Sequence, residues 1–257
     1  MRLKEKVVLI TGSSSGIGKA IALGFANEGA DVIVNYNNRK KSANEVVDNI
    51  KKLGRKSIAI KADVSKANDV NNLVNKAWDE FGRIDVLINN SGITKECSLL
   101  DVSEEMWDEV INVNLKGTFL CSQAIAKKMV LNKIKGKIVN ISSINSVEVE
   151  INRGPYNTSK GGVNLLTKSL AVELGRFGIS VNGIILGTIA GTNIAGDFFN
   201  NEEIIKKILT KTPVGYIGKP EDVVGPALFL ATDDSRYVQG ELIVVDGGLS
   251  VLKFGED

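Results

Sequence analysis

The sequence predicts a single α/β domain, in which a doubly wound parallel sheet of about seven strands is covered by helices on both faces. Short apolar runs rich in β-branched residues alternate along the chain with longer stretches of helical periodicity. Parallel strands need a long crossover connection, usually a helix, and sheets built in this way are buried on both faces. With 257 residues, of which 43% are hydrophobic, the chain can bury a large core, and we expect one domain over residues 1–257.

Strands and helices are expected to alternate from the first strand onward. Strands are expected at residues 7–10, 32–34, 57–60, 85–88, 137–141, 179–184 and 241–245. A glycine-bearing turn at 11–18 leads into a first amphipathic helix, and further helices are expected at 40–53, 70–81, 106–128, 156–177 and 220–231. The segment 187–218 lacks strand character and holds a short helical run at 202–209. Because ligands bind beyond the carboxyl ends of parallel strands, we expect this segment to be a substrate lid; a plain surface excursion is the alternative.

The turn after the first strand carries Gly12, Gly16 and Gly18 in the pattern G-x-x-x-G-x-G. Glycines allow tight turning and let the backbone approach a ligand closely. The free N–H groups and the dipole of the following helix attract a pyrophosphate. A purely structural turn is the alternative, but the strand before it and the helix after it favour a Rossmann-type dinucleotide site.

Tyr156 and Lys160 lie four residues apart on a predicted helix and therefore share one face of it. Neither group is a useful acid or base alone at neutral pH, since free tyrosine titrates near pH ~10 and lysine near ~10.4. A cation beside the phenol should lower the pKa of Tyr156 and make it a proton shuttle for a hydroxyl or carbonyl group. An ordinary exposed helix face is the alternative for this pair.

Four separated motifs, spread over residues 6–248, resemble the short-chain dehydrogenase/reductase family. They are TGSSSGIG at 11–18, NNSG at 89–92, Asn114 in NVNLKG, and Ser143 in NISS followed thirteen residues later by Tyr156 with Lys160. The resemblance implies an enzyme in which Tyr156 exchanges a proton with the reacting oxygen while Ser143 binds that oxygen. It also implies that Lys160 lowers the tyrosine pKa and binds the nicotinamide ribose, and that Asn114 connects to a proton-relay water. The spacing to the tyrosine favours Ser143 over Ser142, which should then point into the sheet.

The resemblance further implies a nicotinamide dinucleotide in the cleft above the sheet. Asp63 with Val64 should contact the adenine edge, although a helix N-cap before Ser65 is a second interpretation of the aspartate. The full set of expected cofactor contacts is Gly12, Ser14, Ser15, Gly16, Ile17, Gly18, Tyr36, Asn37, Arg39, Asp63, Val64, Asn90, Ser91, Gly92, Tyr156, Lys160, Gly187, Thr188, Ile189 and Thr192.

The end of the second strand indicates which dinucleotide is preferred. NAD-binding proteins usually place a carboxylate there for the ribose 2′-OH, whereas NADP-binding proteins supply cations for the 2′-phosphate. After Tyr36 no carboxylate occurs before Glu45, while Arg39 and Lys40 follow at once and Ser15 can donate to phosphate. We therefore expect NADP as the preferred cofactor, with NAD as the alternative.

Composition excludes several classes of protein. A formal net charge of +2 with 24% charged residues gives a mixed surface and no reason to expect a nucleic-acid partner. The absence of histidine excludes a Ser-His hydrolase and a histidine-ligated metal, and no metal site is expected. Cys97 and Cys121 fit no metal spacing or disulfide framework, which favours a reducing cytoplasm. No room for a signal peptide precedes the first strand, and no apolar run approaches the ~18 residues of a membrane span.

The substrate class is indicated by two weaker resemblances. The run TPVGYIGKPEDV at 212–223 and the run NYNN after the second strand resemble the family's sugar 1-dehydrogenases, which implies oxidation of an aldose to a lactone. Several polar residues just beyond Ser143 suit a polyhydroxylated small-molecule substrate, although an exposed polar loop is the alternative; they are Asn145, Glu148, Glu150, Asn152 and Arg153. The run GITKECSLLDV resembles 3-oxoacyl-carrier-protein reductases, the second candidate class. A non-catalytic NADP-binding regulator is the third, but such relatives typically lose the tyrosine or the lysine.

The apolar surface of two helices predicts an oligomer. The helices at 106–128 and 156–177 carry more apolar surface than they need in order to cover one face of the sheet. In the family these helices pair across a two-fold axis, so that we expect a homotetramer, with a monomer as the alternative.

Overall fold

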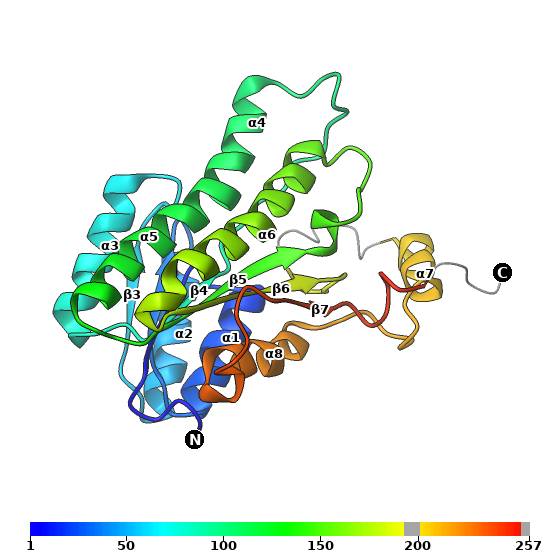
Figure 1. Cartoon of the computed structure of the whole chain (residues 1–257). Coiled ribbons are helices and arrows are strands. Elements are labelled where there is room, and N and C mark those ends of the chain that lie inside the picture. The colour runs from blue at the N-terminus through cyan, green and yellow to red at the C-terminus, as the bar shows by residue number, and fades with distance from the viewer. Residues whose placement is uncertain (193–200, 253–257) are drawn as a thin grey trace.

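The computed structural model describes residues 1–192 and 201–252, which contain one seven-stranded sheet (Figure 1). Its strands are β1 Val7–Ile10, β2 Asp31–Tyr36, β3 Ser57–Lys61, β4 Val86–Asn89, β5 Lys137–Ser143, β6 Ser180–Leu186 and β7 Leu242–Val245. They lie in the order β3-β2-β1-β4-β5-β6-β7, and every pairing is parallel. The predicted α/β fold with a doubly wound parallel sheet is confirmed.

Helices cover both faces of the sheet (Figure 1). They are α1 Gly16–Asn27, α2 Lys40–Lys52, α3 Ala67–Phe81, α4 Glu104–Ile111, α5 Gly117–Leu131, α6 Gly154–Leu174, α7 Glu202–Thr210 and α8 Val224–Ala231. Side chains alternate along each strand, so Val8 packs into the core with α1, α2 and α8, while Leu9 packs into the core with α3, α5 and α6. Two predicted helices end or begin in 3-10 turns: Gly175–Phe177 follows α6, and Pro220–Val223 precedes α8.

The helix predicted at 106–128 differs from the observed one. The observed helical segment begins earlier, at Glu104, and is divided: a π-helical turn at Asn112–Lys116 separates α4 from α5. Such turns insert one residue into an α-helix and are frequent at functional sites. The side chain of Asn114 in this turn reaches across to the backbone of Ile93, which accounts for an amide in the middle of a helix.

The sheet changes direction of winding between β1 and β4. From β1 the chain first builds outward to β2 and β3, and then returns to place β4 on the other side of β1. In such sheets the ligand site lies outside the carboxyl ends of the strands at this switch point. The backbone N–H of Thr11 donates to the carbonyl of Ile88, so the segment after β1 starts beside the end of β4.

Two absences hold for residues 1–192 and 201–252. No helix there has the length and apolar character needed to cross a membrane. In the same residues, no cluster of three or more cysteine, aspartate or glutamate side chains could hold a metal ion.

Candidate active site

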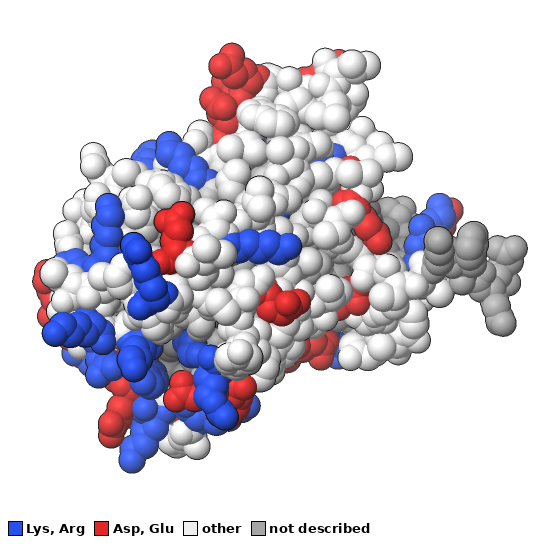
Figure 2. Space-filling view, in the orientation of Figure 1, with Lys and Arg blue, Asp and Glu red and all other residues white. Residues whose placement is uncertain are grey.

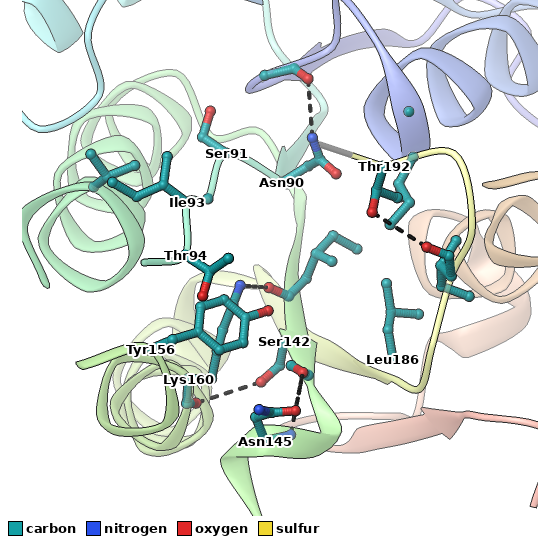
Figure 3. Close-up of a pocket in the computed structure, with 18 of the residues that line it drawn as sticks. Asn90, Ser91, Ile93, Thr94, Ser142, Asn145, Tyr156, Lys160, Leu186 and Thr192 are labelled. Carbon is teal, nitrogen blue, oxygen red and sulfur yellow. Dashed lines mark hydrogen bonds between the residues drawn. The ribbon is translucent and has the colours of Figure 1, made fainter. Parts of the chain in front are cut away.

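A cleft of about 1120 Å³ opens at the carboxyl ends of the strands. Its walls come from the segments after β1, β2, β3, β4, β5 and β6, and from one side of α7. Figure 3 shows Tyr156 and Lys160 projecting from one helix toward the loop that carries Thr94 and toward Ser142. The cleft therefore lies where the switch in sheet winding places a ligand site.

Tyr156 and Lys160 both turn inward from α6. Tyr156 is 5% exposed and Lys160 is 4% exposed. The Nζ of Lys160 donates to the carbonyl oxygen of Ile141 on β5 at 2.9 Å and lies 5.7 Å from the centroid of the Tyr156 ring. The interpretation of this pair as an ordinary exposed helix face is therefore wrong.

The pKa of Tyr156 differs from the sequence-based expectation. Burial raises it above its ordinary value of 10.0, while a hydrogen bond with Ser143 and the charge of Arg153 act in the opposite direction. The lysine expected to lower the tyrosine pKa is itself desolvated, and burial lowers the pKa of Lys160 to about 8. Because the ammonium is directed at Ile141, desolvation of the phenol outweighs its attraction to a cation.

Ser143, which the resemblance implies as the catalytic serine, ends β5 and lines the cleft. Its Oγ accepts a hydrogen bond from the backbone N–H of Asn145 at 3.2 Å. Ser142 was expected to point into the sheet, but its hydroxyl donates to Oδ1 of Asn164 on α6 at 2.6 Å. Neighbouring strand residues point to opposite faces, and this face of β5 is covered by α6, which supplies a polar partner.

Asn114 lies behind the cleft and does not line it. Its Nδ2 donates to the Ile93 carbonyl and to Oγ of Ser159, both at 2.9 Å, and its Oδ1 accepts from the Ile93 N–H at 2.8 Å. The ideal position of a Cβ on Gly92 would lie 3.5 Å from Oδ1 of Asn114 and 3.6 Å from Nζ of Lys160. Asn114 thus fixes the loop after β4 and approaches the lysine across Gly92.

The start of α1 is open to an anion. No acidic residue lies in its first turn, and the side chain of its N-cap, Ser15, makes no capping hydrogen bond. Gly16 lines the cleft with a φ of 53°, and a Cβ there would meet no atom closer than 3.6 Å. The first N–H groups of a helix have no partner within the helix and carry positive partial charge. The residues present therefore fit a pyrophosphate.

The end of β2 places a cation beside the glycine turn. Nη1 of Arg39 donates to Oγ of Ser15 at 3.2 Å, and both residues line the cleft. Asn35, which the sequence did not single out, is buried at the end of this strand and its Oδ1 accepts from the N–H of Gly12 at 3.1 Å. Nδ2 of Asn35 donates to the carbonyl of Ala62 at 3.2 Å. This amide therefore ties together the loops that follow β1, β2 and β3.

The structure brings nearly all of the expected cofactor and substrate residues to one cleft. The expected cofactor contacts that line it are Gly12, Ser14, Ser15, Gly16, Ile17, Tyr36, Asn37, Arg39, Asp63, Val64, Asn90, Ser91, Gly92, Tyr156, Lys160, Gly187, Thr188, Ile189 and Thr192. The expected substrate residues Ser143, Asn145 and Glu148 line it as well. Gly18 does not line the cleft and instead packs against Asn90. Asp63 accepts from the N–H and hydroxyl of Ser65, and α3 has Lys66 as its N-cap, so the aspartate caps the turn before that helix.

Besides Asn35, sequence reasoning missed a stripe along α7 and its C-cap. Ile204, Lys207, Ile208 and Lys211 of this stripe line the cleft. Their spacing of three and four residues marks one helical face and was a usable signal. Glu150 and Arg153, which the sequence offers as polar residues beyond Ser143, also line the cleft, but no sequence pattern reveals their contact with each other.

The buried charge of Lys160 should make stability depend on pH. Its pKa falls from 10.5 to about 8 on folding, so between these values the unfolded chain binds more protons than the folded chain. The free energy of unfolding therefore rises with pH through this window, by about 2 kcal/mol between pH ~7 and ~9.5. Below the window Lys160 is charged in the folded protein, and the full cost of burying its ammonium destabilises the fold. Urea unfolding of wild type and Lys160→Met at both pH values should show this rise in the wild type alone.

The difference between the two proteins isolates the lysine, because other titrating groups contribute equally to both. Tyr156, with its raised pKa, acts with the opposite sign and only above pH ~10. An equal pH slope in wild type and Lys160→Met would contradict a depressed lysine pKa.

Comparison with known proteins gives matches over nearly the whole chain. A family model described as Enoyl-(Acyl carrier protein) reductase matches residues 12–250. The chain is 40% identical to glucose 1-dehydrogenase 2 of Bacillus subtilis (strain 168), with 97% of this chain and 96% of that protein covered. It is 39% identical to the L-rhamnose 1-dehydrogenase (NAD(P)(+)) of Sphingomonas sp. (strain SKA58), covering 97% and 98%. It is 41% identical to the (2S)-[(R)-hydroxy(phenyl)methyl]succinyl-CoA dehydrogenase subunit BbsD of Thauera aromatica, covering 98% and 99%.

A solved structure agrees in fold as well. The gluconate 5-dehydrogenase from Burkholderia cenocepacia J2315, in complex with NADP and tartrate, superposes with a TM-score of 0.92 at 32% identity and covers 97% of each chain. Together with the cleft, these similarities define an NAD(P)-dependent oxidoreductase. The chain belongs to the short-chain dehydrogenase/reductase family. The alternative of a non-catalytic regulator is thereby set aside.

Proposed function

We propose that this protein oxidises a free aldose at its anomeric carbon to the lactone, with NADP as the preferred hydride acceptor. The observation that carries this proposal is the full-length similarity to two aldose 1-dehydrogenases. The cleft supports it, because Glu148 lines the part near Ser143 and is exposed there. A carboxylate can accept hydrogen bonds from sugar hydroxyls, and a site built in this way penalises analogues that lack them.

The residues around Tyr156 account for the proton chemistry of such a reaction. The bound nicotinamide would take the hydride from the anomeric carbon. The Ser143 hydroxyl donates a hydrogen bond to the anomeric oxygen, and Tyr156, in its phenolate form, takes the proton from that oxygen and becomes the neutral phenol as the carbon becomes a carbonyl. Lys160 is buried beside the phenol, where its Nζ donates to the carbonyl of Ile141. Asn114 holds the loop after β4 through Ile93 and so keeps that wall of the site in place.

A substrate panel tests the proposal directly. Purified enzyme is supplied with D-glucose, L-rhamnose, simple alcohols and, in the reductive direction, an acetoacetyl thioester, each with both nicotinamide cofactors. We expect formation of a lactone and NADPH from at least one aldose. Rapid reduction of the thioester with no activity on any hexose or deoxyhexose would overturn the proposal and establish a 3-oxoacyl thioester reductase instead.

The second candidate function, reduction of a 3-oxoacyl thioester, is supported by apolar side chains on the loop after β5. Val149 and Ile151 are exposed on the loop after β5, and Val149 lines the cleft. Apolar side chains at a cleft mouth suit an acyl chain better than a sugar. The similarity to a dehydrogenase of a succinyl-CoA derivative points in the same direction.

Preference for NADP rests on the contact between Arg39 and Ser15. If the guanidinium binds the 2′-phosphate, Arg39→Ala should raise KM for NADP about tenfold or more and leave KM for NAD nearly unchanged. Tyr36→Asp should shift preference toward NAD by placing a carboxylate at the end of β2. Steady-state kinetics with both cofactors measures each effect. A wild-type enzyme that prefers NAD by about tenfold would refute this assignment.

We further propose that the enzyme is a homotetramer of the reducing cytoplasm, with the segment 187–218 as a substrate lid. Residues 193–200 of that segment lie outside the described residues. Leu165 and Val172 on α6 are 67% and 83% exposed, and in Figure 2 charged side chains gather at the lower left, while most of the surface over the first half of α6 is uncharged. Exposed apolar surface of this kind marks protein interfaces. Light scattering that gives the 27.6 kDa mass of one chain would exclude the tetramer.

A further inference from the structure

The side chain of Asn145 is committed to the protein itself. Its Nδ2 donates to Oε2 of Glu150 at 3.1 Å and to Oδ1 of Asn157 at 3.0 Å. Its Oδ1 accepts from the hydroxyl of Ser143 at 3.4 Å (Figure 3). An amide nitrogen carries two hydrogens, and both are used here. Although Asn145 lines the cleft, its amide has no hydrogen left to donate to a substrate.

The backbone of the same residue orients the catalytic serine. The N–H of Asn145 donates to Oγ of Ser143 at 3.2 Å, and Ser143 is the N-cap of the 3-10 turn Ile144–Ser146. A hydroxyl that accepts this hydrogen bond directs its own proton elsewhere. This proton is directed at Oδ1 of Asn145, 3.4 Å away. Asn145 therefore holds the Ser143 hydroxyl through both its N–H and its Oδ1, and the contact with Oδ1 is long enough for the proton to be given to a reacting oxygen that comes closer.

An ion-pair cluster behind Asn145 fixes its amide. Oε2 of Glu150, which accepts from Asn145, lies 3.0 Å from Nη1 of Arg153. Arg153 is only 11% exposed, and its Nη2 and Nε donate to Oε1 of Glu96 at 2.5 and 3.1 Å. Asn157 closes the cluster by donating to the carbonyl of Glu150 at 2.9 Å. Charge-assisted hydrogen bonds to a buried guanidinium are strong and geometrically specific.

The cluster also joins two loops of the active site. Arg153 pairs with Cys97 in an isolated β-bridge, and the N–H of Cys97 donates to the carbonyl of Asn152 at 2.8 Å. Asn152 has a φ of 63°, a left-handed conformation that asparagine tolerates better than most residues. The loop after β5 is thus bound to the loop after β4, which carries Glu96.

We propose that Asn145 is a positioning residue that links the Glu150–Arg153 ion pair to Ser143 and holds the serine hydroxyl as donor to the reacting oxygen. The proposal rests on the proposed function only through the role of Ser143, and it holds for any alcohol or carbonyl substrate. If Asn145 contacted the substrate directly, its replacement would weaken turnover of only the substrate that it recognises. If Asn145 is a positioning residue, its replacement should lower kcat by a common factor for every substrate.

The test compares Asn145→Ala with wild type on an aldose and on a small secondary alcohol. We expect kcat to fall about 10- to 10²-fold by the same factor on both substrates, with KM for the cofactor unchanged. Val147→Ala is the matched control, because Val147 lies on the same loop, is 63% exposed and does not line the cleft. It should keep the kcat and Tm of wild type.

A double-variant cycle gives a readout that a merely structural role would not move. Glu150→Gln removes the charge that pairs with Arg153 and should lower kcat on both substrates, but it should add little to the loss when Asn145→Ala is already present, because the link to Ser143 is then already broken. Fully additive losses in variants whose Tm matches wild type would overturn the proposal. So would an aldose-specific loss in Asn145→Ala, or activity within about twofold of wild type on both substrates. A wild type inactive on every aldose would refute the proposed function, while the ratio measured on the alcohol would still test Asn145.

Discussion

Replacement of Tyr156 by phenylalanine is expected to lower kcat by about 10²–10⁴-fold while cofactor affinity stays close to that of wild type. The ring is 5% exposed and keeps its packing in the variant, so that only the hydroxyl is lost. That hydroxyl interacts with Ser143 and is the group that we propose to take the proton from the reacting oxygen. Turnover is measured with saturating substrate, and cofactor binding by fluorescence titration.

The control for this prediction is Tyr237→Phe, since Tyr237 is 99% exposed and does not line the cleft. It should retain wild-type turnover. A Tyr156→Phe enzyme whose kcat is within about threefold of wild type would exclude the tyrosine as the proton-transfer group.

Because burial raises the Tyr156 pKa, the neutral phenol prevails near neutral pH. The rate of alcohol oxidation should therefore increase as the pH rises.

The sequence predicts the strands and most of the residues that line the cleft, because both follow from local patterns. The apolar runs that form β1 and β2 are buried on both faces, so they carry no alternation and are easily recognised. Parallel strands bring their carboxyl ends to one edge, and this places Gly12, Tyr36 and Ser143 around a common cleft. Motifs that are far apart in the sequence thus lie close together in the fold, because each follows a strand of the same parallel sheet.

Features that depend on contacts between distant loops were not predictable in this way. The π-helical turn at Asn112–Lys116 exists together with the hydrogen bonds from Asn114 to Ile93, which belong to different elements. The pKa of Tyr156 depends on how deeply α6 is buried, and no residue spacing reports that depth. The ion pair of Arg153 with Glu96 joins residues 57 positions apart. Propensity and periodicity describe a residue's own segment and contain no information on such partners.

Gly18 illustrates how one residue type can satisfy a motif for a reason other than ligand contact. It was expected to touch the cofactor, but it lies behind the cleft, where α1 packs on the glycine turn. A Cβ at this position would lie 2.5 Å from Nδ2 of Asn90, 2.8 Å from the carbonyl oxygen of Gly12 and 2.9 Å from Cα of Ser13. Two of these three atoms belong to the backbone and cannot move without shifting the turn.

Gly18→Ala is therefore expected to destabilise the protein by about 1–3 kcal/mol, the usual range for overpacking, and to lower Tm by several degrees, since about 2–4 °C per kcal/mol applies to chains of this size. Nδ2 of Asn90 donates to the carbonyls of Thr11 and Gly12 at 2.9 and 3.2 Å, so a displaced Asn90 should also weaken cofactor binding through the turn. Gly161→Ala is the matched control, because a Cβ on this residue of α6 would meet only the carbonyl oxygen of Ser146 at 3.8 Å. Its Tm should equal or exceed that of wild type, since alanine favours a helix interior over glycine. Equal Tm and equal cofactor affinity in Gly18→Ala and wild type would show that the turn can yield, and that the third glycine of the motif is dispensable for packing.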